Sequence, residues 1–529
     1  MFCTETISAL IHLSDGVTDG EAKALVVSLL GQTRVNVEVV AADARSRGGE
    51  VPGDDGSGRV RTVKGPFATR AAEINAAAKA ARGTILLIVD NRGASVTLAK
   101  SAAETMAMAL RREHGVSMIF SDYQTDVKGQ KKEIRLLDHH VGRVRDFQDF
   151  GRVWMVDRRA FRKVGGCDET LRAGDLYDLR LKLSEVGEVR RIANRYAGSL
   201  YTVGAAGAAH DVFNYLLASK EQQLEVERVV TEHLKRIGAY LKPGAHQAKV
   251  TYTKAEEAAF RDVLVSVISP VNNRPEFVST AIESVQAQTD KRVEHILVVN
   301  GGEGDPTCAA VREYMKGGKR YDPEKPEVRL IVTDVNNLGL CLNTGIEEAR
   351  GKFYLQLDSD DRLKPNAVKE VLKVFASDPK IGMVVGSYDV WQKNDRTGAL
   401  ERREDIPVVT HDEWTEENGR NNLLRINGAG APRAIHKKVW REVGGFGCND
   451  EHGSRNYGED YDLVLRVSER HRIGRVWTAI YEVIRHSGST DHSIDQATID
   501  RNDETKDSMR RLAIQRRIKL NRAARRRRR

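Results

Sequence analysis

The chain has 529 residues, 40% of them hydrophobic and 30% charged, a composition typical of a globular protein with two to four domains. It contains no run of 18 or more apolar residues, and its first residues lack the basic and apolar regions of a signal peptide, so neither a membrane-spanning helix nor export is expected. The five cysteines are scattered and never spaced Cys-x-x-Cys. This argues against a disulfide framework or a zinc site and indicates reduced thiols in the cytoplasm.

The net charge of +9 is concentrated near the C-terminus. Residues 510–529 hold eleven Lys or Arg and no acid, so the rest of the chain is close to neutral and gives no indication of nucleic-acid binding. The basic segment has three interpretations: a solvated tail, a helix that binds the anionic inner face of the cell membrane, or, least favoured, an RNA-binding segment.

In the first part of the chain, the apolar string at residues 85–89 predicts a core strand. It belongs to a pattern that returns later. Four landmarks recur in one order: Ser-x-x-x-Gln-Thr, Ala-Arg-Gly before an apolar run that ends in Asp, Val-Gly-Gly, and Tyr-Asp-Leu followed by Ser-Glu. They begin at Ser28, Ala81, Val164 and Tyr177, and again at Ser284, Ala349, Val443 and Tyr461. The match predicts two copies of one fold, a duplication of domain size.

Between the copies the composition changes. Apolar residues spaced three and four apart predict an amphipathic helix over residues 224–237, which ends before Lys242-Pro243-Gly244. We therefore expect a first copy at residues 1–204 and a helical connector at 205–261.

In the second copy, expected at residues 262–503, strands and helices alternate. The pattern predicts strands at 263–269, 294–299 and 353–357 and helices at 276–287 and 339–349. Such alternation indicates an α/β layer with a largely parallel sheet, whose ligands bind at the carboxyl ends of the strands. A basic helical tail is expected at residues 504–529.

Three carboxylates, Asp358, Asp360 and Asp361, directly follow the apolar run 353–357. An unpaired buried carboxylate costs several kcal/mol, so these acids are expected at the edge of the sheet. There they either share a divalent cation, which prefers oxygen ligands, or form a solvated acidic turn. The motif alone favours neither interpretation.

Two further clusters lie in the second copy. The segment Tyr457-Gly458-Glu459-Asp460-Tyr461-Asp462 precedes an amphipathic run and is expected to open a helix, whose N-terminal dipole by itself accommodates acids. The segment Arg485-His486-Ser487-Gly488-Ser489 places a histidine before a glycine-containing turn. A single histidine in such a place is more commonly structural than a ligand.

Together with Pro270-Val271-Asn272-Asn273-Arg274, these segments resemble the family 2 glycosyltransferases of GT-A fold. The resemblance runs in order from residue 263 to about 489 and also includes Gln288-Thr289, Asn337-Leu338-Gly339, Asn343-Thr344-Gly345, Ala349-Arg350-Gly351 and Val443-Gly444-Gly445-Phe446. It implies an α/β protein with two tandem GT-A domains, Rossmann-like and of the nucleotide-diphospho-sugar transferase type, joined by a helical connector. More loosely, the tandem layout resembles bacterial enzymes that build O-antigen or other surface polysaccharides.

The resemblance implies roles for the acids. Mn²⁺ or Mg²⁺ would bridge them and the diphosphate of a sugar nucleotide, with Asp360 as chief ligand, Asp358 facing the ribose and reaching the metal, and His486 as a later ligand. Asp460 would be the general base of one inverting displacement on an acceptor hydroxyl. Glu459 would raise the pKa of Asp460 by like-charge repulsion or would bind acceptor hydroxyls.

The same resemblance assigns a nucleotide-sugar site, which would include Pro270, Asn272, Arg274, Asn337 and Gly339 in addition to Asp358. Where the family usually has an acid that pairs with the nucleotide base, this chain has Asn300, so the identity of the base stays open. Trp414 is a candidate for stacking on an acceptor sugar, and a core or surface aromatic is an equal alternative.

The first copy lacks the key residues. Aligned on the landmarks, Arg92 stands opposite Asp360, Leu176 opposite Asp460, and, with a shift of one residue, Tyr201 opposite His486; Asp90 stands opposite Asp358. These replacements predict a catalytically inactive first copy. A metal-free nucleotide or anionic-glycan site there stays open, because Arg92 can pair with a phosphate.

The expected function is metal-dependent, inverting transfer of a sugar from a nucleoside-diphosphate sugar to a hydroxyl of a glycan or lipid-linked glycan, by a cytoplasmic enzyme that can be peripheral at the inner face of the membrane. The alternatives are a sugar-nucleotide pyrophosphorylase, which should carry a Gly-rich basic loop after its first strand, and a non-catalytic glycan- or nucleotide-binding scaffold. A two-carboxylate hydrolase is disfavoured because Asp358 and Asp360 are too close in sequence to flank a bond.

Overall fold

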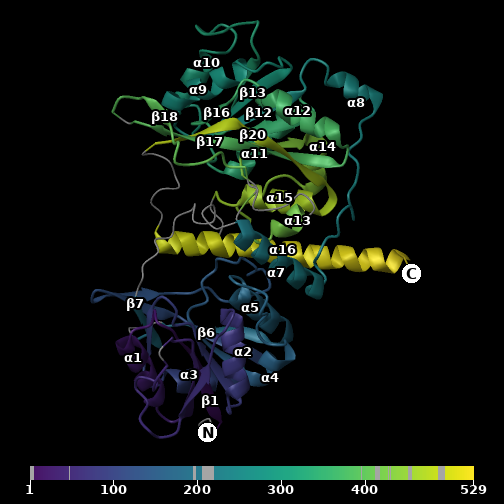
Figure 1. The fold of residues 1–529 in the computed structure, drawn as a ribbon. Helices are drawn as coiled ribbons and strands as arrows, with labels where there is room; N and C mark the ends of the chain where they lie inside the picture. Colours follow the sequence, from purple (N-terminus) through teal and green to yellow (C-terminus); the bar gives the residue numbers. More distant parts are fainter. Residues whose placement is uncertain are drawn as a thin grey trace. The chain divides into compact units, whose positions relative to one another are not determined.

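A computed structural model describes residues 5–46, 48–194, 198–204, 220–394, 396–410, 418–426, 428, 430–450, 456–486 and 495–528. The chain divides into two compact units, Met1–Gly238 and Ala239–Arg529, and each is an α/β unit with its own sheet (Figure 1).

The N-terminal unit is built on a seven-stranded sheet. In spatial order its strands are β10 (Glu188–Ile192), β6 (Val116–Ser121), β9 (Val153–Asp157), β4 (Ile85–Val89), β1 (Thr6–Leu13), β2 (Asn36–Asp43) and β3 (Val60–Lys64). A second sheet contains β5 (Ser95–Leu98), β11 (Tyr201–Gly204), β7 (Tyr123–Val127) and β8 (Gln130–Ile134). The helices are α1 (Asp19–Leu30), α2 (Arg70–Ala80), α3 (Ala102–Arg111), α4 (Arg158–Lys163), α5 (Asp175–Val186) and α7 (Lys220–Ile237).

Alternating side chains of the central strands bury two apolar cores, one on each face of this sheet. Ile7 and Ala9 of β1 pack with residues of α1 and α3, whereas Leu10 and the β4 residue Leu86 pack with residues of α2 and α5. The sheet is therefore covered on both faces, as a mostly parallel sheet requires.

The C-terminal unit has a nine-stranded sheet. Its spatial order is β14 (Glu327–Val332), β13 (Val293–Val299), β12 (Val265–Val271), β15 (Phe353–Gln356), β19 (Arg433–His436), β17 (Ile381–Lys393), β20 (Arg472–Arg485) and β16 (Arg362–Leu363), and β18 (Leu400–Arg402) pairs with β17. The helices are α8 (Lys254–Ala259), α9 (Pro275–Gln286), α10 (Pro306–Arg312), α11 (Leu338–Glu348), α12 (Ala367–Ser377), α13 (Gly419–Asn422), α14 (Lys437–Val443), α15 (Glu459–Arg470) and α16 (Gln496–Arg528). The predicted strands and helices of the second copy are confirmed to within two residues at each end.

The central strands of the two units follow the same order and directions. In the N-terminal unit, β3, β2, β1 and β4 run parallel, and the antiparallel strand β9 lies between β4 and β6. In the C-terminal unit, β14, β13, β12 and β15 run parallel, and the antiparallel strand β19 lies between β15 and β17. The N-terminal unit has a separate second sheet, in which β11 pairs with β5 and β7. In the C-terminal unit the corresponding pairs belong to the main sheet, because β20 is long enough to pair with both β17 and β16. The expected α/β class with two copies of one sheet topology is thus confirmed.

The Ala-Arg-Gly landmark has a physical reason. A buried glutamate, Glu38 or Glu294, accepts a hydrogen bond of 2.6 Å from the serine hydroxyl of the first strand, and that hydroxyl accepts one from the landmark glycine N–H. A Cβ atom on Gly351 would lie 2.7 Å from the nitrogen and Oγ of Ser266, so only glycine lets the chain approach this closely.

The boundaries differ from those expected. The segment 205–261 is divided between the units. The helix α7 belongs to the N-terminal unit, where Glu225 accepts hydrogen bonds from the N–H groups of Ala173 and Gly174. Leu241 belongs to the C-terminal unit, where its backbone exchanges hydrogen bonds with the Asn421 side chain. The basic tail belongs to α16, which begins at Gln496 and buries Met509, Ala513 and Ile514 together with Arg510 and Arg517.

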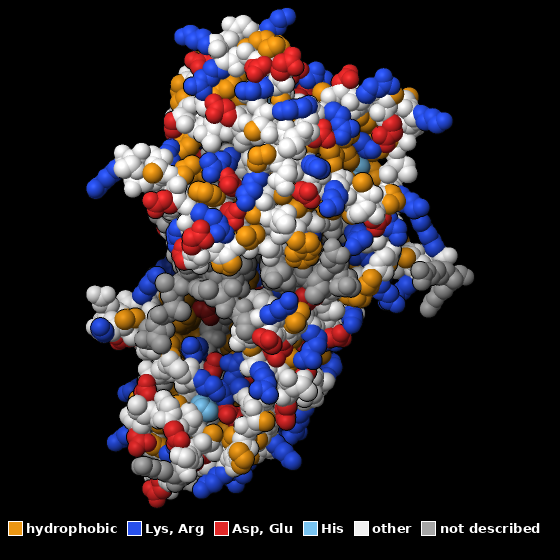
Figure 2. Space-filling view, turned by 45° about the horizontal axis from the view of Figure 1, so that its top comes forward, with side chains coloured by type: hydrophobic (Ala, Val, Ile, Leu, Met, Phe, Trp, Pro, Cys, Tyr) orange, Lys and Arg blue, Asp and Glu red, His pale blue; other side chains and the backbone are white. Residues whose placement is uncertain are grey.

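On the face shown in Figure 2, basic and acidic side chains are interspersed over each unit. Among the described residues, no helix is both long and apolar enough to cross a membrane.

Candidate active site

The acid cluster lies where β15 ends. The strand residues Phe353, Tyr354 and Leu355 are buried, and the N–H of Asp358 donates to the Tyr481 hydroxyl of β20 at 3.1 Å. Asp361 accepts from the same hydroxyl and from a β20 backbone N–H, both at 2.8 Å. Asp361 is therefore committed to holding the turn against β20, which leaves Asp358 and Asp360 as the acids of the site.

His486 is brought to this turn by β20. Its Nε2 lies 3.1 Å from Oδ2 of Asp360, and its side chain is 4% exposed. Its ring stacks on Phe277 of α9 with the centroids 4.5 Å apart, and Lys393 lies 4.4 Å from the centroid of the same phenylalanine. Phe277 could not be predicted as a site residue, because a lone aromatic in the first turn of a helix belongs to no motif.

The carboxylates crowd one another. Burial, together with the charge of Asp360, raises the pKa of Asp358, although Arg433 opposes the shift. Burial and the same neighbouring acids raise the pKa of Asp361 well above its usual range. Burial and the neighbouring charges thus favour the protonated forms of Asp358 and Asp361, and a bound cation would favour the ionised forms.

No group of three or more His, Cys, Asp or Glu side chains among the described residues is arranged to hold a metal ion. The pair Asp360 and His486 nevertheless offers an oxygen and an imidazole nitrogen 3.1 Å apart, and the charge of Asp360 also acts on the carboxylate of Asp358. This donor chemistry fits a divalent cation such as Mn²⁺ or Mg²⁺.

The second acidic motif opens α15, as predicted. Gly458 precedes the helix with φ +84°, and Oδ2 of Asp460 lies 2.9 Å from Nη1 of Arg433. Burial acts to raise the pKa of Asp460, but the charges of Arg433 and Lys506 outweigh it and hold that pKa below its ordinary value. Burial and the charge of Asp460 raise the pKa of Glu459 to about 7. The expectation that Glu459 would raise the pKa of Asp460 is wrong, because the nearby cations favour the ionised form of Asp460 and the repulsion falls on Glu459.

Arg433 is a site residue that the sequence analysis missed. It begins β19, whose register sets Ala434 opposite Leu355 and so brings Arg433 beside the acidic end of β15. Its side chain is 12% exposed, and the charges of Asp460 and Asp358 raise its pKa against the effect of burial. No motif marks this residue, and the pairing of an antiparallel strand nearly 80 positions away cannot be read from hydrophobic periodicity.

Some predicted nucleotide-sugar residues come together at the ends of β12 and β13. The Asn272 amide donates to Oδ1 of Asn300 at 2.7 Å, and the Asn300 amide nitrogen lies 3.3 Å from both Asn336 Oδ1 and Cys341 Sγ. Arg274 ends the same loop, with its guanidinium 5.6 Å from the Phe277 ring centroid.

The remaining predicted residues have structural contacts or lie outside the described chain. Pro270 belongs to β12, in register with Val298. Asn337 caps α11 by accepting from the Leu340 N–H at 2.9 Å, and a Cβ atom on Gly339 would lie 1.8 Å from the Gly447 carbonyl oxygen. Trp414 lies outside the described residues.

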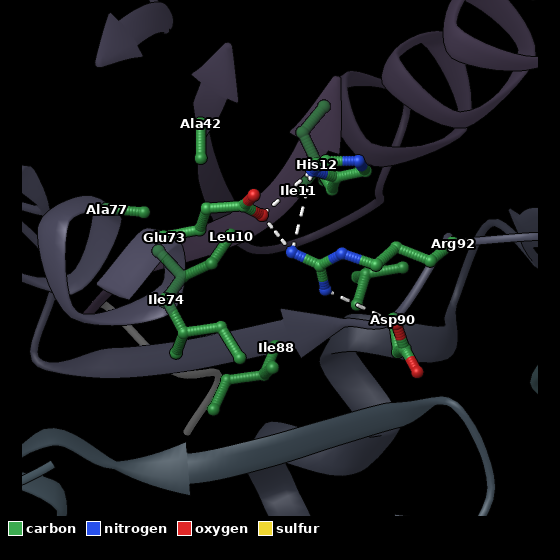
Figure 3. A pocket seen from close by; sticks show the side chains of 11 residues that line it. Leu10, Ile11, His12, Ala42, Glu73, Ile74, Ala77, Ile88, Asp90 and Arg92 are labelled. Atoms are coloured by element: carbon green, nitrogen blue, oxygen red, sulfur yellow. Dashed lines mark hydrogen bonds and ion pairs between the residues drawn. The ribbon is translucent and has the colours of Figure 1, made fainter. Parts of the chain in front are cut away.

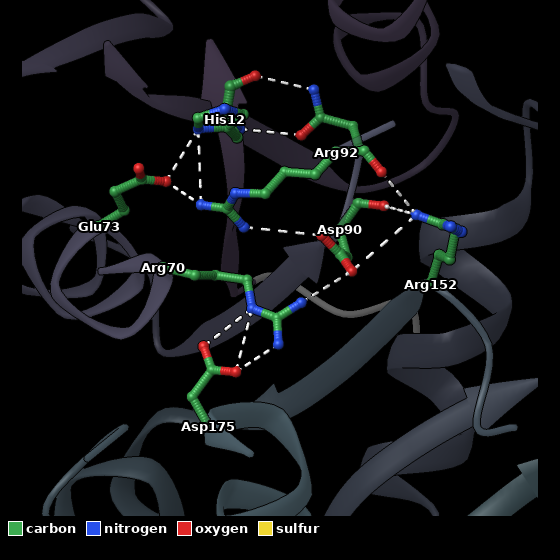
Figure 4. A network of polar contacts seen from close by, with 8 residues as sticks. His12, Arg70, Glu73, Asp90, Arg92, Arg152 and Asp175 are labelled. Carbon is green, nitrogen blue, oxygen red and sulfur yellow. Dashed lines mark hydrogen bonds and ion pairs between the residues drawn. The ribbon is translucent and has the colours of Figure 1, made fainter. Parts of the chain in front are cut away.

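The equivalent position of the N-terminal unit is filled by ion pairs (Figure 4). Arg70 binds Asp175 and lies 3.3 Å from Asp90, Arg92 pairs with Glu73, and Arg152 lies 4.0 Å from Asp90. Three arginines thus face three acids. His12 joins them 2.8 Å from Glu73, and burial, with the charge of Arg92, lowers its pKa to about 4, so it is neutral at pH 7.

Little space is left inside this network. His12, Glu73, Asp90 and Arg92 line a cavity of about 20 Å³ (Figure 3). That volume suits one water molecule, whereas small-molecule sites typically enclose about 300 Å³ or more.

The register corrects one sequence alignment. Tyr201 pairs with Leu98 as Tyr481 pairs with Leu363, so Tyr201 corresponds to Tyr481 and not to His486. The alignment of Leu176 with Asp460 is supported by the first residues of the two helices. The helix α5 begins at Asp175 and α15 begins at Glu459, so the second residue of each is Leu176 or Asp460.

Comparison with known proteins supports the resemblance for one part of the chain. Residues 266–443 match the model described as Glycosyl transferase family 2. The chain is similar to the chondroitin synthase of Escherichia coli (26% identical over 251 residues, 46% of this chain and 33% of that protein) and to the hyaluronan synthase of Pasteurella multocida (26% over 227 residues, 43% of this chain and 21% of that protein). The chain therefore spans a third or less of each of these two relatives.

Among solved structures, a mannosyltransferase of Pyrobaculum calidifontis aligns with 58% of this chain and 84% of its own at 14% identity, with a TM-score of 0.33, which is too low to support an assignment. The resemblance to family 2 glycosyltransferases seen in the sequence is confirmed by this match, which covers residues 266–443, about a third of the chain.

Proposed function

We propose that the C-terminal unit is a metal-dependent, inverting glycosyltransferase that moves a sugar from a nucleoside-diphosphate sugar to a hydroxyl of a glycan or lipid-linked glycan. The observation that carries the proposal is the meeting of two acidic motifs, 100 residues apart, around one cation. Arg433 pairs with Asp460 at 2.9 Å, and its charge also acts on Asp358. A solvated turn and a helix cap would not need this shared partner.

Asp460 is the group that accepts the proton. Its carboxylate is ionised, since Arg433 and Lys506 keep its pKa low. As the acceptor oxygen forms its bond to the anomeric carbon, Asp460 takes the hydroxyl proton, and the bond to the diphosphate breaks with its electron pair leaving on the nucleoside diphosphate. One such displacement inverts the configuration.

Asp360 and His486 would hold the metal, with Asp358 beside them. The ion would act as a Lewis acid that stabilises the charge developing on the leaving diphosphate. Asn272 and Asn300 offer amide groups at the ends of β12 and β13, where a nucleotide would lie in an open α/β sheet. Glu459, next to the base, is the proposed contact for acceptor hydroxyls.

Release of nucleoside diphosphate from a panel of sugar nucleotides, with and without Mn²⁺, tests the proposal. Glycan acceptors are the first to try, because two relatives are named chondroitin synthase and hyaluronan synthase. We expect metal-dependent release that falls by about 100-fold or more in Asp460→Asn and in Asp360→Asn. Asp290→Asn, a change of an acid paired with Arg292 near the surface, should leave the release intact. Absence of release from every donor, with and without metal and acceptor extracts, would instead support the scaffold alternative.

We propose further that the N-terminal unit is non-catalytic and binds no nucleotide. Its three arginines are balanced by three acids, and the cavity between them is about 20 Å³. Nucleotide binding that survives Asp360→Asn and Asn300→Ala in the C-terminal unit but is lost in Arg92→Met would contradict this.

We propose an anionic membrane surface as a further partner of the chain. The buried positions of α16 end at Arg517, and Asn521 still bonds the Tyr240 carbonyl, so we assign membrane contact to the exposed arginines that follow. They are Arg522, Arg525, Arg526 and Arg527. A basic residue near an anionic surface contributes about 1 kcal/mol. Flotation with phosphatidylserine vesicles should therefore require residues 522–529, and equal binding by a chain ending at Asn521 would refute the assignment. With this contact, the proposed location of the enzyme is the cytoplasm, at the inner face of the membrane.

A further inference from the structure

The C-terminal helix α16 lies outside the matched family segment, yet it is an element of the duplicated fold. Nε of Arg516 lies 2.8 Å from the Glu469 carboxylate at the end of α15. In the N-terminal unit, Nε of Arg236 on α7 lies 2.7 Å from Glu185 at the end of α5. Because Ser468-Glu469 and Ser184-Glu185 are matched landmarks, α7 and α16 are the same element in the two copies.

Aligned on this ion pair, most buried positions of α7 are also buried in α16. The buried residues of α7 are Val226, Glu227, Val229, Val230, His233 and Leu234, and the residues aligned with the last five, all buried, are Asp507, Met509, Arg510, Ala513 and Ile514. The helix α16 also buries Thr505, Ser508 and Arg517. Each of the two helices also contacts a matching glycine, Gly174 before α5 or Gly458 before α15. A Cβ atom on Gly174 would lie 3.4 Å from both Val226 and Val229, and one on Gly458 would lie 3.0 Å from Met509 and 3.7 Å from Lys506. Lys506 therefore takes the place of Val226.

The charged groups around Asp460 are absent together from the first copy. Strand pairing sets Ala434 opposite Leu355 and Met155 opposite Leu87, which makes Trp154 the counterpart of Arg433. The three charged residues and their apolar counterparts are Asp460 and Leu176, Arg433 and Trp154, and Lys506 and Val226. A carboxylate and the two cations that act on it were thus exchanged as a set, whereas the ion pair that docks the helix was kept.

We propose that Lys506 is a positioning residue for Asp460, which together with Arg433 supplies the positive charge that holds this carboxylate in its place at the start of α15. Lys506 packs on the turn directly before Glu459, with its ammonium 4.6 Å from the centroid of the Tyr457 ring. The inference rests on the proposed role of Asp460 as general base. It makes the C-terminal helix a part of the acceptor side of the site.

The charges that face Asp460 come from four elements. They are Glu459 of α15, Arg433 of β19, Asp358 and Tyr354 at β15, and Lys506 of α16. Burial acts to lower the pKa of Lys506, but Tyr457 and Asp460 raise it above its ordinary value, so the lysine is charged throughout the neutral range. Loss of this charge leaves Arg433 as the main cation opposing the burial of Asp460.

The experiment is a pH profile of kcat for the full-length chain and three variants. Lys506→Met should lower kcat by about tenfold, with the KM for the donor unchanged, and should move the acidic limb of the profile to higher pH by roughly one unit, because the base is protonated more easily. Lys506→Arg should restore the wild-type limb. Lys519→Met, an exposed lysine of the same helix, should match wild type in both.

An acidic limb of Lys506→Met that coincides with wild type would overturn the proposal, whether or not kcat falls, since packing alone does not move that limb. A second readout is independent of turnover. Titration of the ¹³C carboxyl signal of Asp460, identified by its loss in Asp460→Asn, should show a higher pKa in Lys506→Met, and equal pKa values would refute the proposal. If the wild-type chain turns over no donor, the proposed function fails, and this titration still decides the role of Lys506.

Discussion

Removal of Arg433 should destabilise the C-terminal unit because it leaves a carboxylate without its cation. Loss of one partner of a fully buried ion pair costs about 3–5 kcal/mol. Here the Arg433 side chain is 12% and the Asp460 side chain 26% exposed, so water screens part of the effect and we expect about 2–3 kcal/mol for Arg433→Met. At roughly 2 °C per kcal/mol for a unit of this size, the Tm should fall by about 4–6 °C.

The assay is a double-mutant cycle followed by calorimetry. In Arg433→Met with Asp460→Asn, neither charge is left unpaired, so the double variant should be more stable than the sum of the single effects by about 1.5 kcal/mol or more. Glu38→Gln, a change in the N-terminal unit, identifies which transition belongs to which unit. Effects of Arg433→Met and Asp460→Asn that add within about 0.5 kcal/mol would refute the pairing of these two residues.

Three further predictions concern single sites. Because the pKa of Glu459 is raised to about 7, its ionisation opposes folding, and the stability of the wild-type protein should fall as pH rises from about 5 to 7. Glu459→Gln should remove that fall and be more stable than wild type by about 2–3 kcal/mol at pH 8. Urea titrations at several pH values measure this, and the same dependence of stability on pH in the variant and the wild type would contradict it. Asp360→Asn or His486→Ala should reduce metal-dependent turnover by about 100-fold while chelation abolishes that of wild type, and full activity in a chelator would argue against a metal. Glu294→Gln and Glu38→Gln should each cost about 2–3 kcal/mol in their own unit, since both glutamates accept several hydrogen bonds without exposure to water; neutral behaviour of either would show that the shared contact is dispensable.

The sequence predicted the parts of the fold that depend on local pattern. Alternating apolar runs located the strands, and the two acidic motifs were identified from residue type and spacing. The pairing of β19 with β15 is set by contacts far apart in the chain, so Arg433 carried no local signal. For the same reason an alignment by sequence alone set Tyr201 opposite the wrong residue.

The C-terminal helix shows a different limit. Its buried face carries Arg510 and Arg517 where the matching helix carries Val230 and Ile237, so hydrophobic periodicity found the first helix and described the second as a basic tail. Both arginines are fully buried because their guanidinium groups donate to backbone carbonyls, Arg510 to that of Ile426 and Arg517 to that of Arg420. A net charge read from the sequence thus overstates the positive charge that the surface presents.

The continuity of β20 has a consequence for the histidine at its end. The strand pairs with β17 between Arg472 and Arg485, with three register shifts along the way, and His486 follows it directly. The place of the imidazole is therefore set by the pairing of these two strands. In the N-terminal unit the corresponding strands are separate, with β10 ending at Ile192 and β11 beginning at Tyr201. A Cβ atom on Gly474 would lie 2.5 Å from Cγ1 of Val374, so either that side chain or the strand must shift to accept it. A substitution twelve positions before His486 is therefore expected to displace the imidazole that we propose as a metal ligand. The interior of this strand, and not just its end, thus determines where the histidine lies.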